Sequence, residues 1–530
     1  MNKLRFASLK LHGRKKETDI LRASFNRFVS NLADTESAAN EGGITLNTSK
    51  RQSLARRGSK LTRGNSSKNI SELFPDFSST NSSEVVFISG ESGTGKTALA
   101  ESIKGAVQRG EGIYISGKFD LQNLREPYSG IISLFRELCG ELIELRRTNR
   151  DKYQELRNSI ISEVGDEILL LINVVPVLEE VIENPFIQDV VADHGNKEAK
   201  ERLKYAFLQF FRVITRYFNH LVIVLDDLQW TDALSIELLD GIISDIDIRI
   251  MFIGIYRSNE VDEAHYLSKI IRDMQAAKTR GDFEVTEISV GNLDKATCEE
   301  ILVELLSVDA SAATNRLADI CHKRTVGNAF YFLAFLAMLE EEELLHFNLG
   351  LFKWTWDCDE IEGKTAATSN VVDLILTKIS KQSEEMKYLL RLVSCLGDSF
   401  ERDVVLCAFP KMRDVNECDP AELENEVDEL ISLAIHESFL EAKAGSRYCW
   451  VHDSIQAAAS QQLDETEMNA FKFKLGKVLF QSLGERDVES NLFEIVNMLT
   501  SAEECPEADR ATLLNLCLKA AKVKIPQDCL

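Results

Sequence analysis

One short stretch constrains the fold of this chain more than any other. Residues 84–102 read EVVFISGESGTGKTALAES, in which Gly90 to Thr97 fit the pattern G-x-x-x-x-G-K-[ST]. An apolar run precedes the pattern and a helical segment follows it, which is the context of a phosphate-binding loop. Glycines in such a loop let backbone N–H groups converge on phosphate oxygens. The stretch therefore predicts a nucleoside triphosphate site, and the alternative is an ordinary glycine-rich turn between a strand and a helix.

Two side chains of this loop carry the predicted chemistry. Lys96 can bridge the β- and γ-phosphates of ATP, and the Thr97 hydroxyl can ligate Mg²⁺. The predicted nucleotide-binding residues of the loop are Gly90, Glu91, Ser92, Gly93, Thr94, Gly95, Lys96 and Thr97.

Strands and helices alternate after the loop. Continuous apolar runs at 221–225 (LVIVL) and 248–256 (IRIMFIGIY) are typical of central parallel strands, which are buried on both faces. Helical patterns lie between the strands, with a strong apolar face over 197–218. This order predicts an α/β fold with a P-loop NTPase parallel sheet.

Acidic residues follow the strand at 221–225. Ligands of open α/β sheets bind at the carboxyl ends of the strands, where Asp226 and Asp227 lie. We expect Asp226 to hold Mg²⁺ together with Thr97, and Asp227 to orient or deprotonate the attacking water. The predicted catalytic residues are thus Asp227 and Lys96; the alternative is a plain acidic turn.

Arg257 ends the next apolar strand. A cation at that position can sense the γ-phosphate. The alternative is a surface arginine paired with an acidic neighbour such as Glu260.

Length and charge limit the classes of function. At about 150 residues per domain, 530 residues correspond to three or four domains. The net charge is 61 − 85 = −24, which argues against nucleic acid and anionic membranes as partners. The N-terminus lacks the apolar stretch of a signal peptide, and the run at 331–339 is much shorter than the ~20 residues of a membrane span. We expect a cytoplasmic protein.

A Ser-rich segment interrupts the N-terminal part of the chain. Residues 50–68 carry seven Lys and Arg and no acidic residue, a composition that favours disorder over residues 34–83. The sequence RRGS, which ends at Ser59, suits phosphorylation by a kinase with acidic recognition pockets. The alternative is a solvated low-complexity loop.

The remaining chain is mostly helical, with two hairpin patterns. Helices followed by the hairpin at 438–453 indicate a winged-helix-like module. The predicted divisions are an N-terminal segment of the ATPase module (1–33), the insert (34–83), the NTPase core (84–290), a helical lid (291–345), a hairpin connector (346–367), the winged-helix-like module (368–460) and the start of a helical repeat region (461–530).

Five stretches together resemble one family. They are LHGRKKETDILRASF, ISGESGTGKTALA, GKFD with PYSGIISLF, LVIVLDDLQWTD with GIYRSNEVD, and NVVDLILTKI leading to WVHDSIQAAA. The chain resembles the signal-transduction ATPases with numerous domains, and more closely the origin-recognition-complex-like AAA ATPase module found fused to kinases and cyclases. We expect no kinase or cyclase domain within these 530 residues.

The resemblance implies roles for residues that spacing could not assign. Gly13 and Arg14 match the element that borders the adenine pocket. Asn328, in TVGNAF, matches a Gly-Asn-Pro turn of the lid, although Ala329 replaces the proline. His452 matches a winged-helix histidine that, in related switch ATPases, contacts the β-phosphate of ADP. Without the resemblance, a lone histidine is more often a packed or surface residue than a ligand.

The expected function is an ATP-dependent regulatory switch in signal transduction, with ATP, ADP and Mg²⁺ as ligands and unidentified signalling proteins as partners. A nucleotide-dependent oligomer is a further expectation. Two rivals stay open: a DNA-loading ATPase of the replication-initiator type, and a scaffold that binds ATP without hydrolysing it.

Overall fold

The computed structural model covers all 530 residues. The residues whose placement it describes are 11–41, 83–119, 128–183, 197–280, 284–365, 371–413, 420–443, 446–484, 491–501 and 513–518, besides residues 4, 6, 9, 488 and 510.

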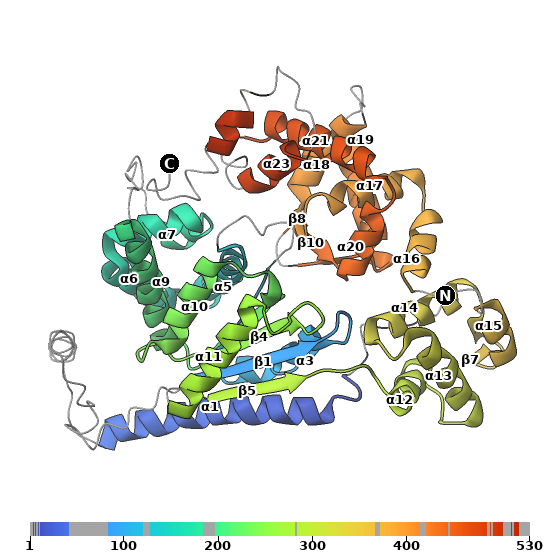
Figure 1. The fold of residues 1–530 in the computed structure, drawn as a ribbon, viewed down its shortest axis with the longest axis horizontal. Coiled ribbons are helices and arrows are strands. Elements are labelled where there is room, and N and C mark those ends of the chain that lie inside the picture. Colours follow the sequence, from blue (N-terminus) through green and yellow to red (C-terminus); the bar gives the residue numbers. More distant parts are fainter. Residues whose placement is uncertain are drawn as a thin grey trace.

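A five-stranded parallel sheet forms the centre of the NTPase core (Figure 1). Its strand order is β2-β3-β4-β1-β5, and the predicted fold class is confirmed. The register pairs Gly90 with Arg257 and Lys118 with Asp226, so all four lie at the carboxyl edge of the sheet. The strands are β1 (Glu84–Gly90), β2 (Ile113–Lys118), β3 (Leu221–Asp226), β4 (Met251–Arg257) and β5 (Glu284–Ser289).

Helices cover both faces of this sheet, as the buried apolar strands require. The face with the larger apolar core carries α5 (Ser129–Thr148), α6 (Arg150–Val164), α7 (Ile168–Val174), α8 (Leu178–Ile182), α9 (Lys197–Tyr217), α10 (Ala233–Ser244) and α11 (Tyr266–Arg280), with short 3₁₀ turns at Gly165–Glu167 and Leu228–Trp230. The other face carries α1 (Lys15–Glu41), α3 (Lys96–Glu101) and α4 (Lys104–Arg109).

The first helix corrects one predicted boundary. We expected the Ser-rich insert to begin at residue 34, but α1 continues to Glu41. Alanine and glutamate are frequent in residues 33–41, and their helix propensity outweighs the serine and asparagine among them. The rest of the predicted insert, residues 42–82 with Ser59, lies outside the described residues.

The lid follows β5 and has its own apolar core. Its elements are α12 (Lys295–Leu306), α13 (Ala312–Thr325), α14 (Ala329–Glu341), the hairpin β6 (Leu345–Asn348) and β7 (Lys353–Trp356), and α15 (Cys358–Lys364).

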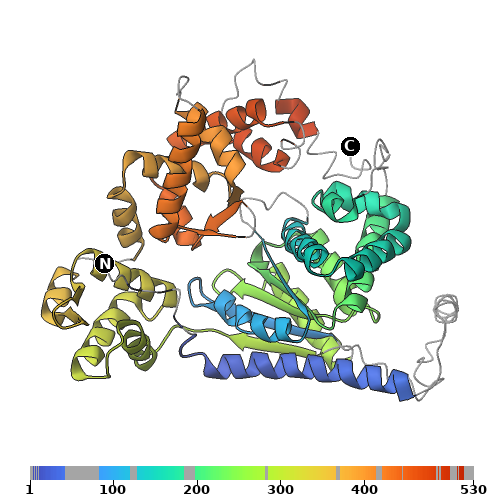
Figure 2. The same cartoon turned by 180° about the vertical axis from the view of Figure 1, so that it is seen from behind.

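The winged-helix-like module contains a three-stranded antiparallel sheet, β8-β10-β9, and shares one core with the helices that follow it. Figures 1 and 2 show this module and α1 at opposite ends of the molecule, with the parallel sheet between them. The elements of the module are α16 (Val371–Ser380), α17 (Glu384–Ser394), β8 (Ser399–Glu401), α18 (Arg402–Met412), α19 (Pro420–His436), β9 (Leu440–Ala442), β10 (Arg447–Trp450) and α20 (Asp453–Ser460). The helices that follow it are α21 (Glu465–Ser482) and α23 (Leu492–Leu499).

Candidate functional site

The loop Gly90–Thr97 joins β1 to α3 and has the backbone of a phosphate-binding loop. Gly93 (φ 77°) and Gly95 (φ 89°) adopt left-handed conformations, which side-chain-bearing residues rarely adopt. A Cβ atom on Gly93 would lie 2.6 Å from Oδ1 of Asn328. The loop therefore needs glycine at position 93 for two reasons, its backbone angle and its contact with the lid.

Lys96 lies buried beneath this loop. Its Nζ atom donates to the Glu91 carbonyl at 2.7 Å. Burial lowers the pKa of Lys96, while the carboxylates of Asp226 and Asp227 act in the opposite direction. The ammonium group is thus placed inside the loop, at the depth where phosphates would bind.

Thr97 and Asp226 lie together, as the magnesium prediction requires. The Thr97 hydroxyl donates to Oδ2 of Asp226 at 2.7 Å, and the other oxygen of Asp226 accepts from the Asp227 amide at 2.8 Å. Burial, followed by the charge of Asp227, raises the pKa of Asp226. A hydroxyl beside a carboxylate is a fitting oxygen pair for Mg²⁺.

Asp227 is surrounded by donors. Nε of Arg257 lies 2.9 Å from Oδ1, and Nε2 of Gln229 donates to the same oxygen at 2.8 Å. The Lys118 ammonium is 3.6 Å from Oδ2. Gln229 is itself oriented, because its Oε1 accepts from the Arg257 amide at 3.1 Å. The sequence did not single out Gln229 or Lys118 as site residues. The available signals were the position of Gln229 two residues after Asp227 and the position of Lys118 in GKFD.

Arg257 is not a free surface residue. Its guanidinium stacks over Trp230, with 4.4 Å to the ring centroid, and its side chain is only 12% exposed. It contacts Glu260 at 3.2 Å, as the surface alternative supposed, but also binds Asp227 and Asp453. Arg257 therefore connects the core to the winged-helix-like module.

Arg14 contacts the backbone of the loop, and Gly13 packs against the first helix of the lid. The Arg14 guanidinium donates to the carbonyls of Thr94 (3.1 Å) and Gly291 (2.5 Å). Gly13 is left-handed (φ 64°), and a Cβ atom there would lie 2.4 Å from a Thr297 methyl carbon. The structure thus brings both residues to the loop and the first lid helix.

Asn328 connects the lid to the loop. Its Nδ2 donates to the Ser92 carbonyl at 2.8 Å, while its Oδ1 caps α14 by accepting from the Tyr331 amide. The amide of Phe330 adds a bond to the Gly93 carbonyl at 3.0 Å. These bonds place the lid directly against the glycine-rich loop.

His452 reaches the same loop from the winged-helix-like module. Its Nε2 lies 3.4 Å from the Ser92 hydroxyl, and its ring stacks on Phe330 at 3.7 Å between centroids, nearly parallel at 9°. Burial lowers its pKa to about 4. Nδ1 accepts from the Ser454 amide at 3.1 Å, so the neutral ring carries its proton on Nε2, facing the loop.

Asp453, the next residue, completes the connection between the two parts. Its carboxylate lies 3.0 Å from the Lys118 ammonium and pairs with Arg257. Asp398 adds a second carboxylate 2.9 Å from Lys118. Burial acts to raise the pKa of Asp453, but Lys118 and Arg257 outweigh it and hold that pKa at about 2.

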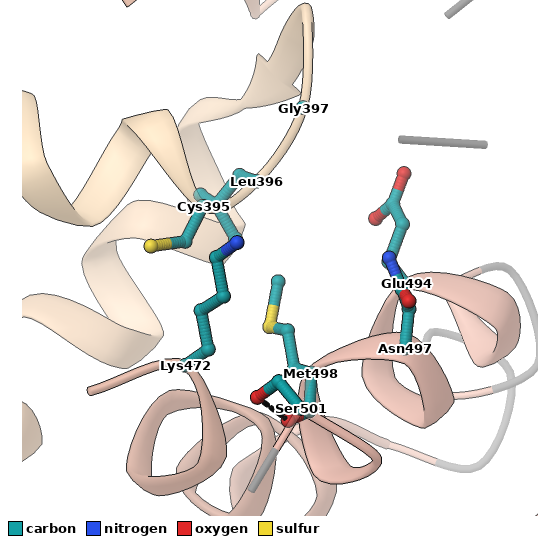
Figure 3. A pocket seen from close by; sticks show the side chains of 8 residues that line it. All are labelled: Cys395, Leu396, Gly397, Lys472, Glu494, Asn497, Met498 and Ser501. Carbon is teal, nitrogen blue, oxygen red and sulfur yellow. Dashed lines mark hydrogen bonds between the residues drawn. The ribbon is translucent and has the colours of Figure 1, made fainter. Parts of the chain in front are cut away.

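A separate small pocket lies within the winged-helix-like module and the helices after it (Figure 3). It has a volume of about 110 Å³, and none of its residues was predicted as a site. The side chains of Lys472 and Glu494 lie on opposite sides of it. It is lined by Cys395, Leu396, Gly397, Lys472, Glu494, Asn497, Met498 and Ser501.

Comparison with known families gives one match. Residues 63–253 are similar to the AAA ATPase domain. This match supports an AAA-like P-loop module in that part of the chain. Among the described residues, no helix is both long and apolar enough to span a bilayer.

Two curated relatives are much longer proteins. The Dictyostelium discoideum hybrid signal transduction histidine kinase G is 24% identical over 387 residues, covering 61% of this chain and 11% of that protein. Histidine protein kinase 1 of Candida albicans is 23% identical over 189 residues, covering 32% of this chain and 7% of that protein. This chain therefore corresponds to a small part of each.

Solved structures also align over most of the chain, with low scores. A Walker-type ATPase of Pyrococcus abyssi is 11% identical, covers 71% of this chain and 90% of its own, and has a TM-score of 0.31. The ORC2 protein of Aeropyrum pernix is 12% identical, covers 78% and 95%, and has a TM-score of 0.29.

Proposed function

We propose that this protein is an ATP-dependent regulatory switch, and that the docked arrangement of the winged-helix-like module is its closed state. The observation that carries the proposal is the contact of His452 and Asp453 with the nucleotide loop and Arg257. A module that touches both the loop and a cation beside the catalytic carboxylate can respond to the nucleotide that is bound.

The site residues fit Mg²⁺ and a nucleotide. The loop presents its backbone around Lys96, and Thr97 with Asp226 offers two oxygens for the metal. When bound, Mg²⁺ would neutralise phosphate charge and polarise the phosphoryl group. Arg14 and Asn328 hold the loop carbonyls in place, so they position the loop without needing to touch phosphate.

Asp227 is the group that would accept a proton from water. In the closed state its two oxygens accept hydrogen bonds from Arg257, at 2.9 and 3.3 Å, and Oδ1 also accepts from Gln229. A carboxylate whose oxygens already accept hydrogen bonds from a guanidinium and an amide has fewer lone pairs left to contact and orient the attacking water. We therefore expect slow hydrolysis while the winged-helix-like module is docked.

The names of the two relatives support a signalling context. Both are called histidine kinases, and the match to this chain covers 11% of one and 7% of the other. We infer that the module regulates an attached or associated signalling enzyme, in a nucleotide-dependent manner that includes changes of oligomeric state. The net charge of −24 and the lack of a predicted basic face weigh against a DNA-loading role.

A combined assay tests the proposal. Small-angle scattering of the protein saturated with Mg·ADP should give a smaller radius of gyration than with a non-hydrolysable ATP analogue. Steady-state ATPase activity should be slow and unchanged by double-stranded DNA. Equal radii in both nucleotides would contradict the switch, and stimulation by DNA would favour a loader. An absence of hydrolysis with preserved ATP binding would favour the scaffold.

A further inference from the structure

The small pocket in Figure 3 is a part of the molecule that nucleotide binding does not use. One wall comes from a single face of α23 and the turn after it, since the lining residues 494, 497, 498 and 501 follow the helical spacing i, i+3, i+4 and i+7. Another wall comes from Lys472 of α21 and from residues 395–397, which join α17 to β8. The pocket therefore lies between the winged-helix-like module and the helices that follow it.

Close packing of α21 against α23 holds the walls of the pocket in place. A Cβ atom on Gly476 would lie 2.9 Å from Cβ of Met498, so only a glycine lets the two helices approach this closely. Lys472 is four residues before Gly476 and lies on the same face of α21, toward α23. Both helices share the apolar core of the module. The packing of the protein itself thus forms the pocket.

The lining places opposite charges on two sides of the pocket. In Figure 3 the ammonium end of Lys472 lies toward Cys395, whereas the side chains of Glu494 and Asn497 lie across the pocket, with Met498 between the two sides. No ion pair joins Lys472 to Glu494, and all the lining residues belong to the described part of the chain. A ligand that carries both charges would match this arrangement.

Cys395 contributes a neutral group to the lining. Its thiol donates to the Arg391 carbonyl at 3.5 Å and lies 3.7 Å from Sδ of Met468. Burial raises the pKa of Cys395 to about 11, although the charge of Lys472 acts in the opposite direction. The thiol is therefore protonated at neutral pH, and the pocket offers a binding site rather than a nucleophile.

The turn that lines the pocket is continuous with the docked interface. Its last residue, Gly397, has a φ of 97°, and its carbonyl accepts from the indole N–H of Trp450 at 3.2 Å. The next residue, Asp398, lies 2.9 Å from the Lys118 ammonium of the core, and its carbonyl accepts from the Trp450 amide. Trp450 is two residues before His452. A ligand that contacts this turn would therefore act on the backbone beside both docking residues.

We propose that the pocket binds a small zwitterion of the α-amino acid type, and that this ligand favours the docked state. Lys472 would bind the carboxylate and Glu494 the ammonium group, both through charge-assisted hydrogen bonds. The volume of about 110 Å³ has room for about three or four water molecules, which suits glycine or alanine and excludes an aromatic amino acid. Because the docked arrangement contains the pocket, a ligand bound there selects that arrangement. Only the regulatory half of this inference rests on the proposed function.

The probe for binding is L-alanine, titrated calorimetrically into the whole protein with and without saturating Mg·ADP. We expect one site per chain. Propionate, which lacks the ammonium group, and ethylamine, which lacks the carboxylate, should bind about tenfold or more weakly, because each loses hydrogen bonds between charged groups. Lys472→Met should weaken alanine binding by a similar factor. Lys474→Met, which changes an exposed lysine of the same helix, is the matched control and should bind alanine normally.

Three results would refute the site. The first is an absence of alanine binding to the wild-type protein, which would mean that the pocket holds water only. The second is equal affinity for alanine, propionate and ethylamine, which needs no variant to fold. The third is equal alanine affinity in the wild type and in Lys472→Met.

Nucleotide affinity tests the regulatory half. Alanine should tighten ADP binding by about fivefold or more, and ADP should tighten alanine binding by the same factor, because such coupling is reciprocal. Asp398→Asn should bind alanine equally with and without ADP, since its contact with Lys118 is weakened. Alanine binding that leaves the ADP affinity unchanged would overturn this half. Equal radii of gyration in both nucleotides, with alanine still bound, would instead reject the switch and keep the site.

Discussion

The Nε2 atom of His452 lies 3.4 Å from the hydroxyl of Ser92, although 360 positions separate the two residues in the chain. Ser92 belongs to the loop that would surround the phosphates, and His452 begins a helix of the winged-helix-like module. The ring is neutral with its proton on Nε2, so it can donate to an oxygen bound in the loop. This contact leads to the first prediction.

Replacing His452 by alanine should weaken ADP binding by about 10- to 150-fold, the equivalent of one hydrogen bond to a charged group at about 1.5–3 kcal/mol. ATP binding should change little, because in the proposed scheme His452 contacts only the closed, ADP-bound form. Titration of both nucleotides measures the affinity ratio. His436→Ala, an exposed histidine of the same module, is the control. An unchanged ADP/ATP ratio would make His452 a packing residue only.

Lys96→Ala should abolish nucleotide binding in a protein that remains folded. Removing the ammonium leaves the β- and γ-phosphates without their main side-chain cation. Binding of a fluorescent ATP analogue measures the loss, and Lys104→Ala, which changes a lysine of the next helix, should bind normally. Normal analogue binding by Lys96→Ala would refute the assignment of the loop.

Substitutions of the two adjacent carboxylates, Asp226 and Asp227, should have different effects on Mg²⁺ binding and on turnover. Asp227→Asn should keep Mg·ATP and lower kcat, because an amide can still accept from Arg257 but cannot take a proton. Asp226→Asn should instead raise the Mg²⁺ concentration needed for binding, since it weakens the oxygen pair with Thr97. Mg²⁺ titrations of nucleotide affinity and turnover distinguish them, and the opposite pattern would exchange the two roles.

Lys118→Met should loosen the docked module. The lysine lies 2.9 Å from Asp398 and 3.0 Å from Asp453, so its loss leaves two half-buried carboxylates with one fewer cation. We expect a larger radius of gyration in ADP and faster turnover, because the proposed scheme ties slow hydrolysis to the docked module. Lys381→Met, which removes an exposed ion pair with Glu342, is the control. A compact variant in ADP would show that Lys118 does not hold the closed state.

Mild acid should destabilise the closed state through His452. The folded pKa of about 4 lies below the ordinary 6.5, so between these values the unfolded or undocked histidine binds more protons than the docked one. The stabilisation is complete above about pH 6.5 and falls as the pH drops towards 4, by at most about 3 kcal/mol. Melting temperatures between pH 7 and 4.5 measure this loss.

In His452→Gln that part of the pH dependence should disappear, because glutamine does not titrate. Equal slopes in wild type and His452→Gln would assign the acid sensitivity to other groups. Asp453, with a pKa of about 2, contributes only below about pH 4 and does not interfere in this window.

Local sequence patterns determined the α/β core and the position of the nucleotide loop. The short runs at 221–225 and 248–256, rich in valine and isoleucine, are typical of buried strands, and the glycines at 93 and 95 are required by the backbone itself. Asp226 and Asp227 follow their strand directly, so their position at the sheet edge also follows from the sequence. The helix end at Glu41 was predicted wrongly. The segment was assigned from the serine-rich composition that follows it, although the alanine and glutamate in residues 33–41 favour a helix.

Only the tertiary structure decided what surrounds those residues. Arg257 holds Asp227 and Asp453 together, and Lys118 binds carboxylates about 280 and 335 positions away. A sequence pattern records which face of a strand or helix is buried, but ion pairing depends on distances of a few ångströms between groups from different modules. Those distances arise from the docking of separate apolar cores, which no local periodicity encodes.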